Sequence, residues 1–326
     1  MSSWAKPSAN CEDMTLGVVR LGNTGLEVTN LAIGTSALSS MPSVYGYEVE
    51  RERALQTLRK ALDSPVRLLD TSNGYGGGNS ERLLGEVLRE RGGVPEGVLV
   101  STKVDPDRSG DFSGARVRRS LEESCERLGL DYLPLLFLHD PERTGFEECM
   151  APGGAVPALV ALKEEGIVGH LGVAGGPVGL MERYVKTGMF EVLLTHNRLT
   201  LLDRSASSLA DLCARVGVAL INAAPFGGGL LARGPASEGN YAYRRAPDGL
   251  VSRAKEIEAS CGRYGVPMAV AALQFSMRDP RVSSTVVGVT RPERVDQAIE
   301  MAAYEVPPAL WEELAVLAAP QELWLW

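Results

Sequence analysis

The chain has 326 residues, of which 44% are hydrophobic and 23% charged, and this globular composition allows a large buried core. Its formal net charge is -8, and no run of basic residues exceeds the doublets that begin at Arg118 and Arg244, so a nucleic-acid partner is not expected. The N-terminal segment lacks the apolar core of a signal peptide, and no uncharged apolar stretch reaches the ~18 residues of a membrane span, so the sequence predicts a cytoplasmic protein that does not bind membranes.

Cysteine and histidine residues show no metal-site spacing. The five cysteines are odd in number, scattered and free of any Cys-x-x-Cys pair, so we expect reduced thiols that mostly serve packing. The three histidines, His139, His170 and His196, are too widely separated for a zinc motif. No metal cofactor is therefore predicted.

Taken in chain order, the first predicted element is a β-hairpin over residues 17–30, in which "GNTG" forms the turn between two extended arms. Short apolar runs then alternate with amphipathic segments. The predicted strands cover 31–35, 66–70, 98–103, 133–139, 167–173, 190–196, 218–224 and 283–289. The predicted helices cover 48–62, 79–91, 114–129, 155–165, 177–187, 205–215, 248–264 and 291–303. The segment after Pro308 is predicted to form one more helix and an aromatic tail.

This alternation predicts a (β/α)8 barrel. Strands without polar alternation are typical of a sheet buried on both faces, and strict alternation with helices indicates parallel pairing through right-handed crossovers. An open, doubly wound sheet is the alternative, but it normally carries GxGxxG after its first strand, and "IGTSALSS" lacks that pattern. We therefore expect one α/β barrel domain over residues 1–326, with the hairpin at its bottom and residues 1–16 as a flexible N-terminal tail.

Four titratable residues fall near the ends of three consecutive predicted strands. Asp70 ends the second strand, Lys103 the third and His139 the fourth, while Tyr75 lies in the glycine-rich loop after the second. In a parallel barrel these ends share one rim, where reactive side chains sit. Each residue alone has a structural explanation, as a loop cap, a rim charge, a core histidine or a lid, but together they predict an active site.

The same four residues have complementary chemistry. A phenol is a poor proton donor or acceptor at neutral pH, and a neighbouring ammonium group favours its phenolate, so Lys103 is expected to lower the pKa of Tyr75. A lysine drawn into a cleft needs a counter-charge, which Asp70 can supply. His139 can orient a carbonyl or hydroxyl oxygen across the rim.

Several segments resemble those of the aldo-keto reductase family: "LDTSNGYGGGNSERLLG", "VLVSTKV", "RSLEESCERLGLDYLPLLFLHDPE" and "EEGIVGHLGV". The resemblance extends over nearly the whole chain. The family's Asp, Tyr, Lys and His tetrad matches Asp70, Tyr75, Lys103 and His139, and the residues that flank them match as well. Within the family, "HDPE", "LTLLDR", "GGGLLA", "YAYRRAP" and "AALQF" are most similar to the branch that contains L-fucose dehydrogenase, D-threo-aldose 1-dehydrogenase and pyridoxal 4-dehydrogenase.

This resemblance implies hydride transfer between a nicotinamide cofactor, NAD or NADP, and a carbonyl or alcohol carbon, with Tyr75 as general acid in reduction and general base in oxidation. It also implies a cofactor that lies extended over the barrel rim without a Rossmann fold. The cofactor contacts that it implies are Asp70, Asn197, Pro225, Phe226, Gly228, Leu230, Gly288, Thr290, Arg294 and Gln297. The loop "PFGGGLLARG", residues 225–234, is expected to cover the pyrophosphate, with a flexible lid as the alternative.

Two departures from the family pattern affect the cofactor. An Ala-Gly pair at 174–175 stands where many relatives have the Ser-Asn pair that holds the carboxamide, so His196 or Asn197 is expected to replace it. Gly288 stands where many NADP-dependent relatives have a lysine near the adenosine phosphate, while Arg294 matches a cofactor-contacting arginine. The sequence therefore leaves both NAD and NADP open.

The branch resemblance also implies a small-molecule substrate, an aldose that is oxidised at its anomeric carbon to a lactone, with L-fucose, D-arabinose or L-galactose as candidates. A pyridoxal-like or other aldehyde is the alternative substrate, and a nicotinamide-binding sensor barrel with little catalysis is the alternative function. Each sugar hydroxyl needs a polar partner. The expected substrate contacts are Tyr47, Asp140, Tyr243 and Trp324. We expect a monomer or a small homo-oligomer.

Overall fold

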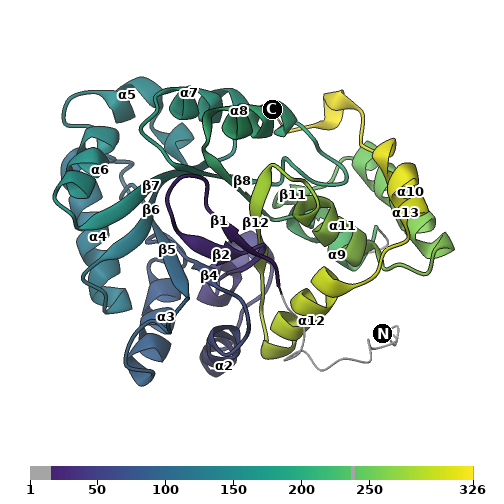
Figure 1. Ribbon diagram of the computed structural model, residues 1–326, viewed down its shortest axis with the longest axis horizontal. Helices are drawn as coiled ribbons and strands as arrows, with labels where there is room; N and C mark the ends of the chain where they lie inside the picture. Colours follow the sequence, from purple (N-terminus) through teal and green to yellow (C-terminus); the bar gives the residue numbers. More distant parts are fainter. Residues whose placement is uncertain (1–15, 236–238, 326) are drawn as a thin grey trace.

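Eight parallel strands form a closed barrel at the centre of the computed structural model, which describes residues 16–235 and 239–325 (Figure 1). Their order around the barrel is β12-β3-β4-β5-β6-β7-β8-β9. The strands are β3 (Leu31–Gly34), β4 (Leu68–Asp70), β5 (Leu99–Val104), β6 (Leu133–His139), β7 (Val168–Gly175), β8 (Val192–His196), β9 (Ala219–Ala223) and β12 (Val282–Gly288). This arrangement confirms the predicted (β/α)8 barrel. The predicted N-terminal tail lies outside the described residues apart from Leu16.

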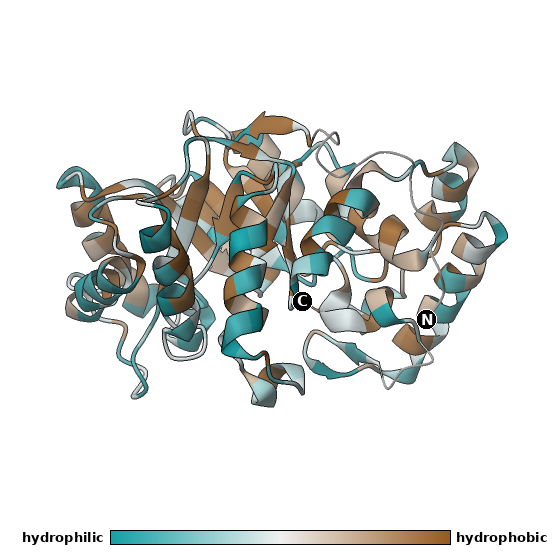
Figure 2. Ribbon diagram, turned by 90° about the horizontal axis from the view of Figure 1, so that it is seen from below, coloured by the Kyte–Doolittle hydropathy of each residue, from teal (hydrophilic) through white to brown (hydrophobic). Residues whose placement is uncertain are grey.

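A ring of helices covers the outside of the barrel, with apolar faces turned inward and polar faces outward (Figure 2). The ring consists of α2 (Arg51–Leu62), α3 (Asn79–Glu90), α4 (Gly114–Leu128), α6 (Ala155–Glu164), α7 (Val178–Lys186), α8 (Ser207–Val216), α11 (Met268–Met277) and α12 (Pro292–Ala303). In α3, for example, Leu84 and Val87 are fully buried while Arg82 and Arg89 are exposed. Burial of such apolar stripes holds the ring against the strands.

The helix that precedes β12 differs from the prediction. The sequence predicted residues 248–264 for this position, and α10 (Asp248–Arg263) does form there, but α11 is the helix that packs against β12 and α12. Most residues of α11 are buried, so its sequence lacks the one-sided apolar periodicity that identifies a surface helix. The short helix α9 (Leu230–Arg233) and α10 cover its other sides.

The predicted N-terminal hairpin closes one end of the barrel. Its strands β1 (Val18–Arg20) and β2 (Glu27–Thr29) pair antiparallel, and Figure 1 shows them lying across the ring of strands. Val28 is fully buried among side chains of the barrel interior. Ser284, near the start of β12, donates a hydrogen bond from Oγ to the carbonyl oxygen of Thr29 at 2.8 Å. The hairpin therefore seals the end where the strands begin.

Shorter elements lie in the connections: α1 (Pro42–Tyr45), α5 (Phe146–Met150), β10 (Asn240–Tyr241) and β11 (Arg244–Arg245). The predicted C-terminal helix is α13 (Pro308–Ala315), and the chain after it returns to the loop that follows β8. There the backbone N–H of Leu325 donates to Asp203 Oδ2 at 2.6 Å, and Arg198 Nε donates to the carbonyl oxygen of Leu325 at 3.0 Å. Over the described ranges, no helix is both long enough and apolar enough to cross a bilayer.

A close backbone contact fixes the spacing between α3 and α4. A Cβ atom at Gly85 would lie 1.9 Å from the carbonyl oxygen of Arg127. Gly85→Ala is therefore expected to lower the free energy of unfolding by about 1–3 kcal/mol, because one helix must shift. Gly179→Ala in α7, where nothing lies within 4 Å of the new Cβ atom, is the control and should be neutral or slightly stabilising. Urea unfolding of both variants measures the difference, and equal stabilities would contradict the close contact.

Candidate active site

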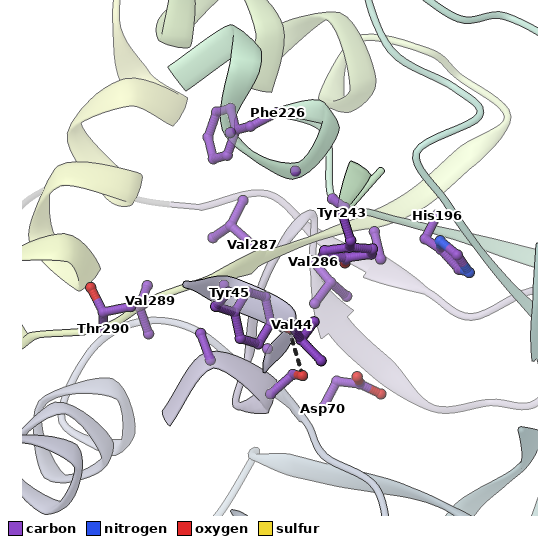
Figure 3. A pocket seen from close by; sticks show the side chains of 18 of the residues that line it. Val44, Tyr45, Asp70, His196, Phe226, Tyr243, Val286, Val287, Val289 and Thr290 are labelled. Atoms are coloured by element: carbon purple, nitrogen blue, oxygen red, sulfur yellow. Dashed lines mark hydrogen bonds between the residues drawn. The ribbon is translucent and has the colours of Figure 1, made fainter. Parts of the chain in front are cut away.

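The C-terminal ends of the strands surround a cavity of about 1060 Å³. Asp70, Tyr75, Lys103 and His139, which the sequence places on one rim, all line this cavity. Figure 3 shows Asp70 in the pocket together with Val44, Tyr45, His196, Phe226, Tyr243, Val286, Val287, Val289 and Thr290. The loops after several different strands therefore build one site.

Lys103 is buried, and its ammonium group has three hydrogen-bond acceptors. Its Nζ atom lies 2.6 Å from Asp70 Oδ2 and 2.7 Å from the carbonyl oxygen of Thr71. The same atom donates to the phenol oxygen of Tyr75 at 3.2 Å. Asp70 Oδ1 accepts a second hydrogen bond, from Ser101 Oγ at 3.0 Å. Asp70 lies opposite Ser101 in the β4–β5 pair, so alternation along β5 brings Ser101 and Lys103 to the same carboxylate.

The surroundings of Tyr75 raise the pKa of its phenol well above the usual value. Burial is the largest cause, and the negative charge of Asp70 is the next. The expectation of a lowered pKa is wrong as the net result, because burial and the Asp70 carboxylate, 2.6 Å from the ammonium group, outweigh the opposing effect of Lys103. Tyr75 is therefore a neutral phenol that accepts a hydrogen bond from Lys103 and keeps its own proton for donation.

His139 is held by an acidic residue, Asp105, that sequence reasoning missed. His139 Nδ1 lies 2.8 Å from Asp105 Oδ1 and 3.0 Å from Ser72 Oγ. Ser72 also donates to Asp105 Oδ2, which accepts the backbone N–H of Gly74 at 2.7 Å. The rings of His139 and Tyr75 meet edge to face with their centroids 5.6 Å apart. The two side chains that can meet a substrate oxygen are thus adjacent.

The sequence carries one signal that could have identified Asp105. It lies in "VDPDRSGD", where its acid is hard to distinguish from those of Asp107 and Asp111. Only its position identifies it. Side chains alternate along an extended strand, so Asp105, two residues after Lys103, is expected on the same side of the chain as Lys103. The structure separates the three acids clearly, because Asp105 is 4% exposed whereas Asp107 and Asp111 lie at the surface.

Most of the predicted cofactor contacts converge on the cavity. Those that line it are Asp70, Phe226, Gly228, Gly288, Thr290, Arg294 and Gln297. The structure buries Asn197, Pro225 and Leu230 behind this lining, and Leu230 belongs to the apolar core. Asn197 acts on the cavity through residues that line it, because its Nδ2 atom donates to His196 Nδ1 at 3.0 Å and its side chain also interacts with Tyr243.

The loop over residues 225–234 suits an elongated phosphate-containing ligand. Its glycines at 227–229 have φ angles of 60°, 74° and 119°, a region that favours glycine and leaves backbone groups uncovered by side chains. Arg233 in this loop and Arg294 in α12 both line the cavity, and both act electrostatically on Tyr47. Two guanidinium groups beside a glycine-rich loop fit the phosphates of a nicotinamide dinucleotide.

His196 presents a hydrogen-bond donor near the Ala-Gly pair at 174–175. Burial lowers the pKa of His196 to about 4, so its ring is neutral near pH 7. Its Nδ1 atom accepts from Asn197, so the ring hydrogen lies on Nε2. The Ala-Gly pair lines the cavity without polar side chains, and His196 lines it as well. The imidazole can therefore take the place of a side-chain amide that holds a carboxamide oxygen.

Three of the predicted substrate contacts also line the cavity: Tyr47, Asp140 and Tyr243. Tyr45 stacks on Tyr47 with their centroids 5.8 Å apart and meets Tyr243 edge-on at 5.9 Å, so aromatic rings border the mouth. Trp324 is not part of the lining, because its indole N–H donates to the carbonyl oxygen of Ala319 at 2.8 Å within the C-terminal segment.

The cysteine, histidine and acidic side chains of the described residues form neither a metal centre nor a disulfide. Among residues 16–235 and 239–325, no cluster of three or more His, Cys, Asp or Glu side chains could hold a metal ion. The cysteines that the structure describes are free thiols: Cys125, Cys149, Cys213 and Cys261.

A phenol, an ammonium–carboxylate pair and an imidazole at one rim of a parallel barrel define an enzyme site that moves a proton to or from an oxygen atom. The model of the Aldo/keto reductase family matches residues 30–318. The chain belongs to the aldo/keto reductase family, and it is an oxidoreductase with the nicotinamide dependence expected of that family.

Three characterised relatives are similar over most of their length. D-threo-aldose 1-dehydrogenase of a Pseudomonas species is 35% identical over 81% of this chain and 87% of its own. Pyridoxal 4-dehydrogenase of Microbacterium luteolum is 30% identical over 90% of this chain and 95% of its own. L-galactose dehydrogenase of Arabidopsis thaliana is 33% identical over 86% of each chain.

Solved structures show the same fold. An aldo-keto reductase of Bacillus halodurans superposes with a TM-score of 0.78 at 21% sequence identity, over 94% of this chain and 97% of its own. This likeness concerns the barrel architecture.

Proposed function

We propose that the enzyme oxidises an aldose at its anomeric carbon to the lactone, with NAD or NADP as hydride acceptor. The observation that carries this proposal is the polar wall beside Tyr75, where His139, Asp140, Arg143 and His196 line the same cavity. A pyranose needs several such partners, because each hydroxyl buried without one costs about 1–3 kcal/mol. The aromatic rings at the mouth suit the C–H faces of a sugar ring.

The names of the relatives favour an aldose over a pyridoxal-type aldehyde as the substrate. Two of the three, D-threo-aldose 1-dehydrogenase and L-galactose dehydrogenase, are named as sugar dehydrogenases. The third, pyridoxal 4-dehydrogenase, makes a pyridoxal-type aldehyde the second candidate substrate. A flat pyridine ring would use the aromatic border at the mouth more than the polar wall.

In this proposal Asp70, Tyr75, Lys103 and His139 are the catalytic group. A nicotinamide dinucleotide held by Arg233, Arg294 and the loop over 225–234 would supply the hydride acceptor for oxidation and the hydride donor for reduction. Tyr75 exchanges the proton of the substrate oxygen, and Lys103 stabilises the phenolate that forms when that proton is lost. Asp70 keeps Lys103 charged inside the protein. His139 forms a hydrogen bond to the same substrate oxygen.

A substrate panel tests the proposal. Rates are measured from nicotinamide absorbance with L-fucose, D-arabinose, L-galactose, D-glucose and pyridoxal, each with NAD and with NADP. We expect turnover of at least one aldose and slower turnover of pyridoxal. Activity with pyridoxal alone would overturn the sugar assignment, and binding of cofactor without turnover of any compound would favour the sensor alternative.

For the cofactor, we expect NAD and NADP to bind with dissociation constants that differ by about tenfold or less, because Gly288 supplies no cation for the adenosine phosphate. Arg294→Ala should weaken NADP more than NAD, since the arginine can pair with that phosphate. Quenching of tryptophan fluorescence measures both constants without turnover. Arg253→Ala is the matched control, because Arg253 is ion-paired with Glu256 and is not part of the cavity lining. Strong NADP preference that survives Arg294→Ala would move the phosphate site to another residue, with Arg233 the next candidate.

A further inference from the structure

We infer that Asp105 is a positioning residue that sets both the tautomer and the proton occupancy of His139, an inference that rests on the proposed function. Its carboxylate is the acid nearest to the His139 ring, with Oδ1 2.8 Å from Nδ1. Asp105 itself contacts neither Tyr75 nor Lys103 through any described hydrogen bond. It therefore acts through His139.

The hydrogen bonds of Asp105 connect the histidine to the loop that carries Tyr75. Asp105 Oδ1 faces His139, while Oδ2 accepts from Ser72 Oγ and from the backbone N–H of Gly74. Ser72 and Gly74 lie three residues and one residue before Tyr75 in the chain. One buried carboxylate thus fixes the distance between the two groups that can meet a substrate oxygen. A residue that merely capped the loop would not require the imidazole as a partner.

The same contacts determine where the hydrogen atoms lie. A carboxylate accepts only, so His139 must donate its Nδ1–H to Asp105, which leaves Nε2 as the nitrogen available to a substrate. Nε2 lies on the side of Asp140, whose Oδ1 atom is 3.8 Å away. A substrate oxygen at this position therefore meets either an Nε2 lone pair or an Nε2–H, according to the charge of the ring.

Electrostatics favour the charged ring. Burial raises the pKa of Asp105, but the charge and hydrogen bond of His139, together with Ser72 and Gly74, lower it to about 2. Burial lowers the pKa of His139, and the charges of Asp105 and Asp140 outweigh it, so the net pKa is raised. The other titratable groups that face this ring are Tyr75, Lys103, Glu142 and His196.

This pair affects both directions of the reaction through one hydrogen bond. In reduction, a protonated His139 donates a hydrogen bond from Nε2 to the carbonyl oxygen, so activity falls as the pH rises through the pKa of His139. In oxidation, Tyr75 takes the proton of the substrate hydroxyl and the protonated His139 donates to the same oxygen, so this activity also loses its donor as the pH rises through that pKa. Loss of the negative charge at Asp105 lowers that pKa and moves both limbs to lower pH.

Asp105→Asn tests the inference, because the amide carries no charge and its one oxygen can still accept the Nδ1–H, at the expense of the hydrogen bond from the backbone N–H of Gly74. NMR titration of the imidazole rings follows His139 directly, and the chain contains only two other histidines. We expect the pKa of His139 to fall by about one unit or more, as an opposite charge at this distance is removed. Asp107→Asn, an exposed acid of the same loop, is the matched control and should leave this pKa unchanged.

Kinetics supply the second measurement. With D-glyceraldehyde as a probe for reduction and L-fucose as a probe for oxidation, the alkaline limb of kcat/KM that reports His139 should move down with the NMR pKa. Cofactor dissociation constants from fluorescence should remain within about twofold, because the hydrogen bonds of Asp105 involve neither Arg233 nor Arg294, the arginines proposed to hold the phosphates. Asp105→Ala should lower kcat further than Asp105→Asn, since it also removes the acceptor that keeps the hydrogen of His139 on Nδ1.

A folded Asp105→Asn protein in which the pKa of His139 falls by less than about one unit would overturn the inference. An equal loss of activity at every pH, with no shift of either limb, would also overturn it and assign Asp105 a structural role. The proposed function fails separately. Wild-type protein that turns over neither probe would defeat the proposed function, while the NMR titration would still decide whether Asp105 controls His139.

Discussion

Tyr75→Phe is expected to lower kcat by a factor on the order of 10²–10⁴ while cofactor dissociation constants stay within a few-fold of wild type. The substitution removes one oxygen, which accepts from Lys103 and would pass the proton to the substrate, and it leaves the ring beside His139 in place. Steady-state rates and fluorescence titration of the cofactor measure the two effects.

Tyr45→Phe is the matched control for this experiment. Tyr45 lines the same cavity, but its hydroxyl is paired with Ser36 Oγ at 2.7 Å rather than with the lysine. We expect this variant to change kcat by less than about tenfold. A Tyr75→Phe enzyme with near wild-type turnover would show that the proton comes from another group.

Lys103→Met is expected to reduce stability as well as turnover. The side chains of Lys103 and Asp70 are 1% and 6% exposed, so loss of the lysine leaves a buried, uncompensated carboxylate. Removal of one partner from a buried ion pair costs about 3–5 kcal/mol of unfolding free energy. Turnover should fall too, because the phenolate of Tyr75 loses its neighbouring cation.

The double variant Asp70→Asn/Lys103→Met separates these two effects. It removes both charges, so urea unfolding should show that much of the lost stability returns. Turnover should remain low, because the cation is still missing. Restored stability together with restored turnover would assign Lys103 a purely structural role, and a double variant no more stable than Lys103→Met would contradict the ion-pair account.

The four rim residues could be predicted because a parallel barrel imposes a simple rule. Strands that run in the same direction end at the same rim, so Asp70, Lys103 and His139 at three successive strand ends had to lie close together. Tyr75 followed from its place in the next loop. Residue type and strand order were sufficient for this part of the site, and no side-chain packing had to be known.

Distances between buried charges could not be predicted in the same way. The pKa of Tyr75 depends on how closely Asp70 compensates Lys103, and only the fold supplies the 2.6 Å separation. The role of Asp105 could not be predicted from the sequence, because this residue is buried through its contacts with Ser72 and Gly74 in a neighbouring loop. Interactions between loops that are distant in sequence leave no periodic signal.

The helix α11 and the C-terminal segment illustrate the same limit for the fold. α11 is enclosed by the barrel on one side and by outer helices on the others, so its sequence shows no polar face to mark it. Trp324 has the character of a pocket residue in sequence, yet the turn that brings its indole N–H to Ala319 directs it elsewhere. Both outcomes depend on how peripheral segments pack onto a completed barrel.

The hairpin adds a second layer beneath a barrel that its own side chains already fill. Leu21 and Val28 have no exposed surface and pack with interior residues of the strands such as Phe137, so no passage joins the hairpin end to the site at the opposite rim. Substrate and product must therefore both exchange with solvent on the rim side. Release of the product has to precede entry of the next substrate, so its rate sets an upper limit on turnover that faster proton or hydride transfer cannot raise.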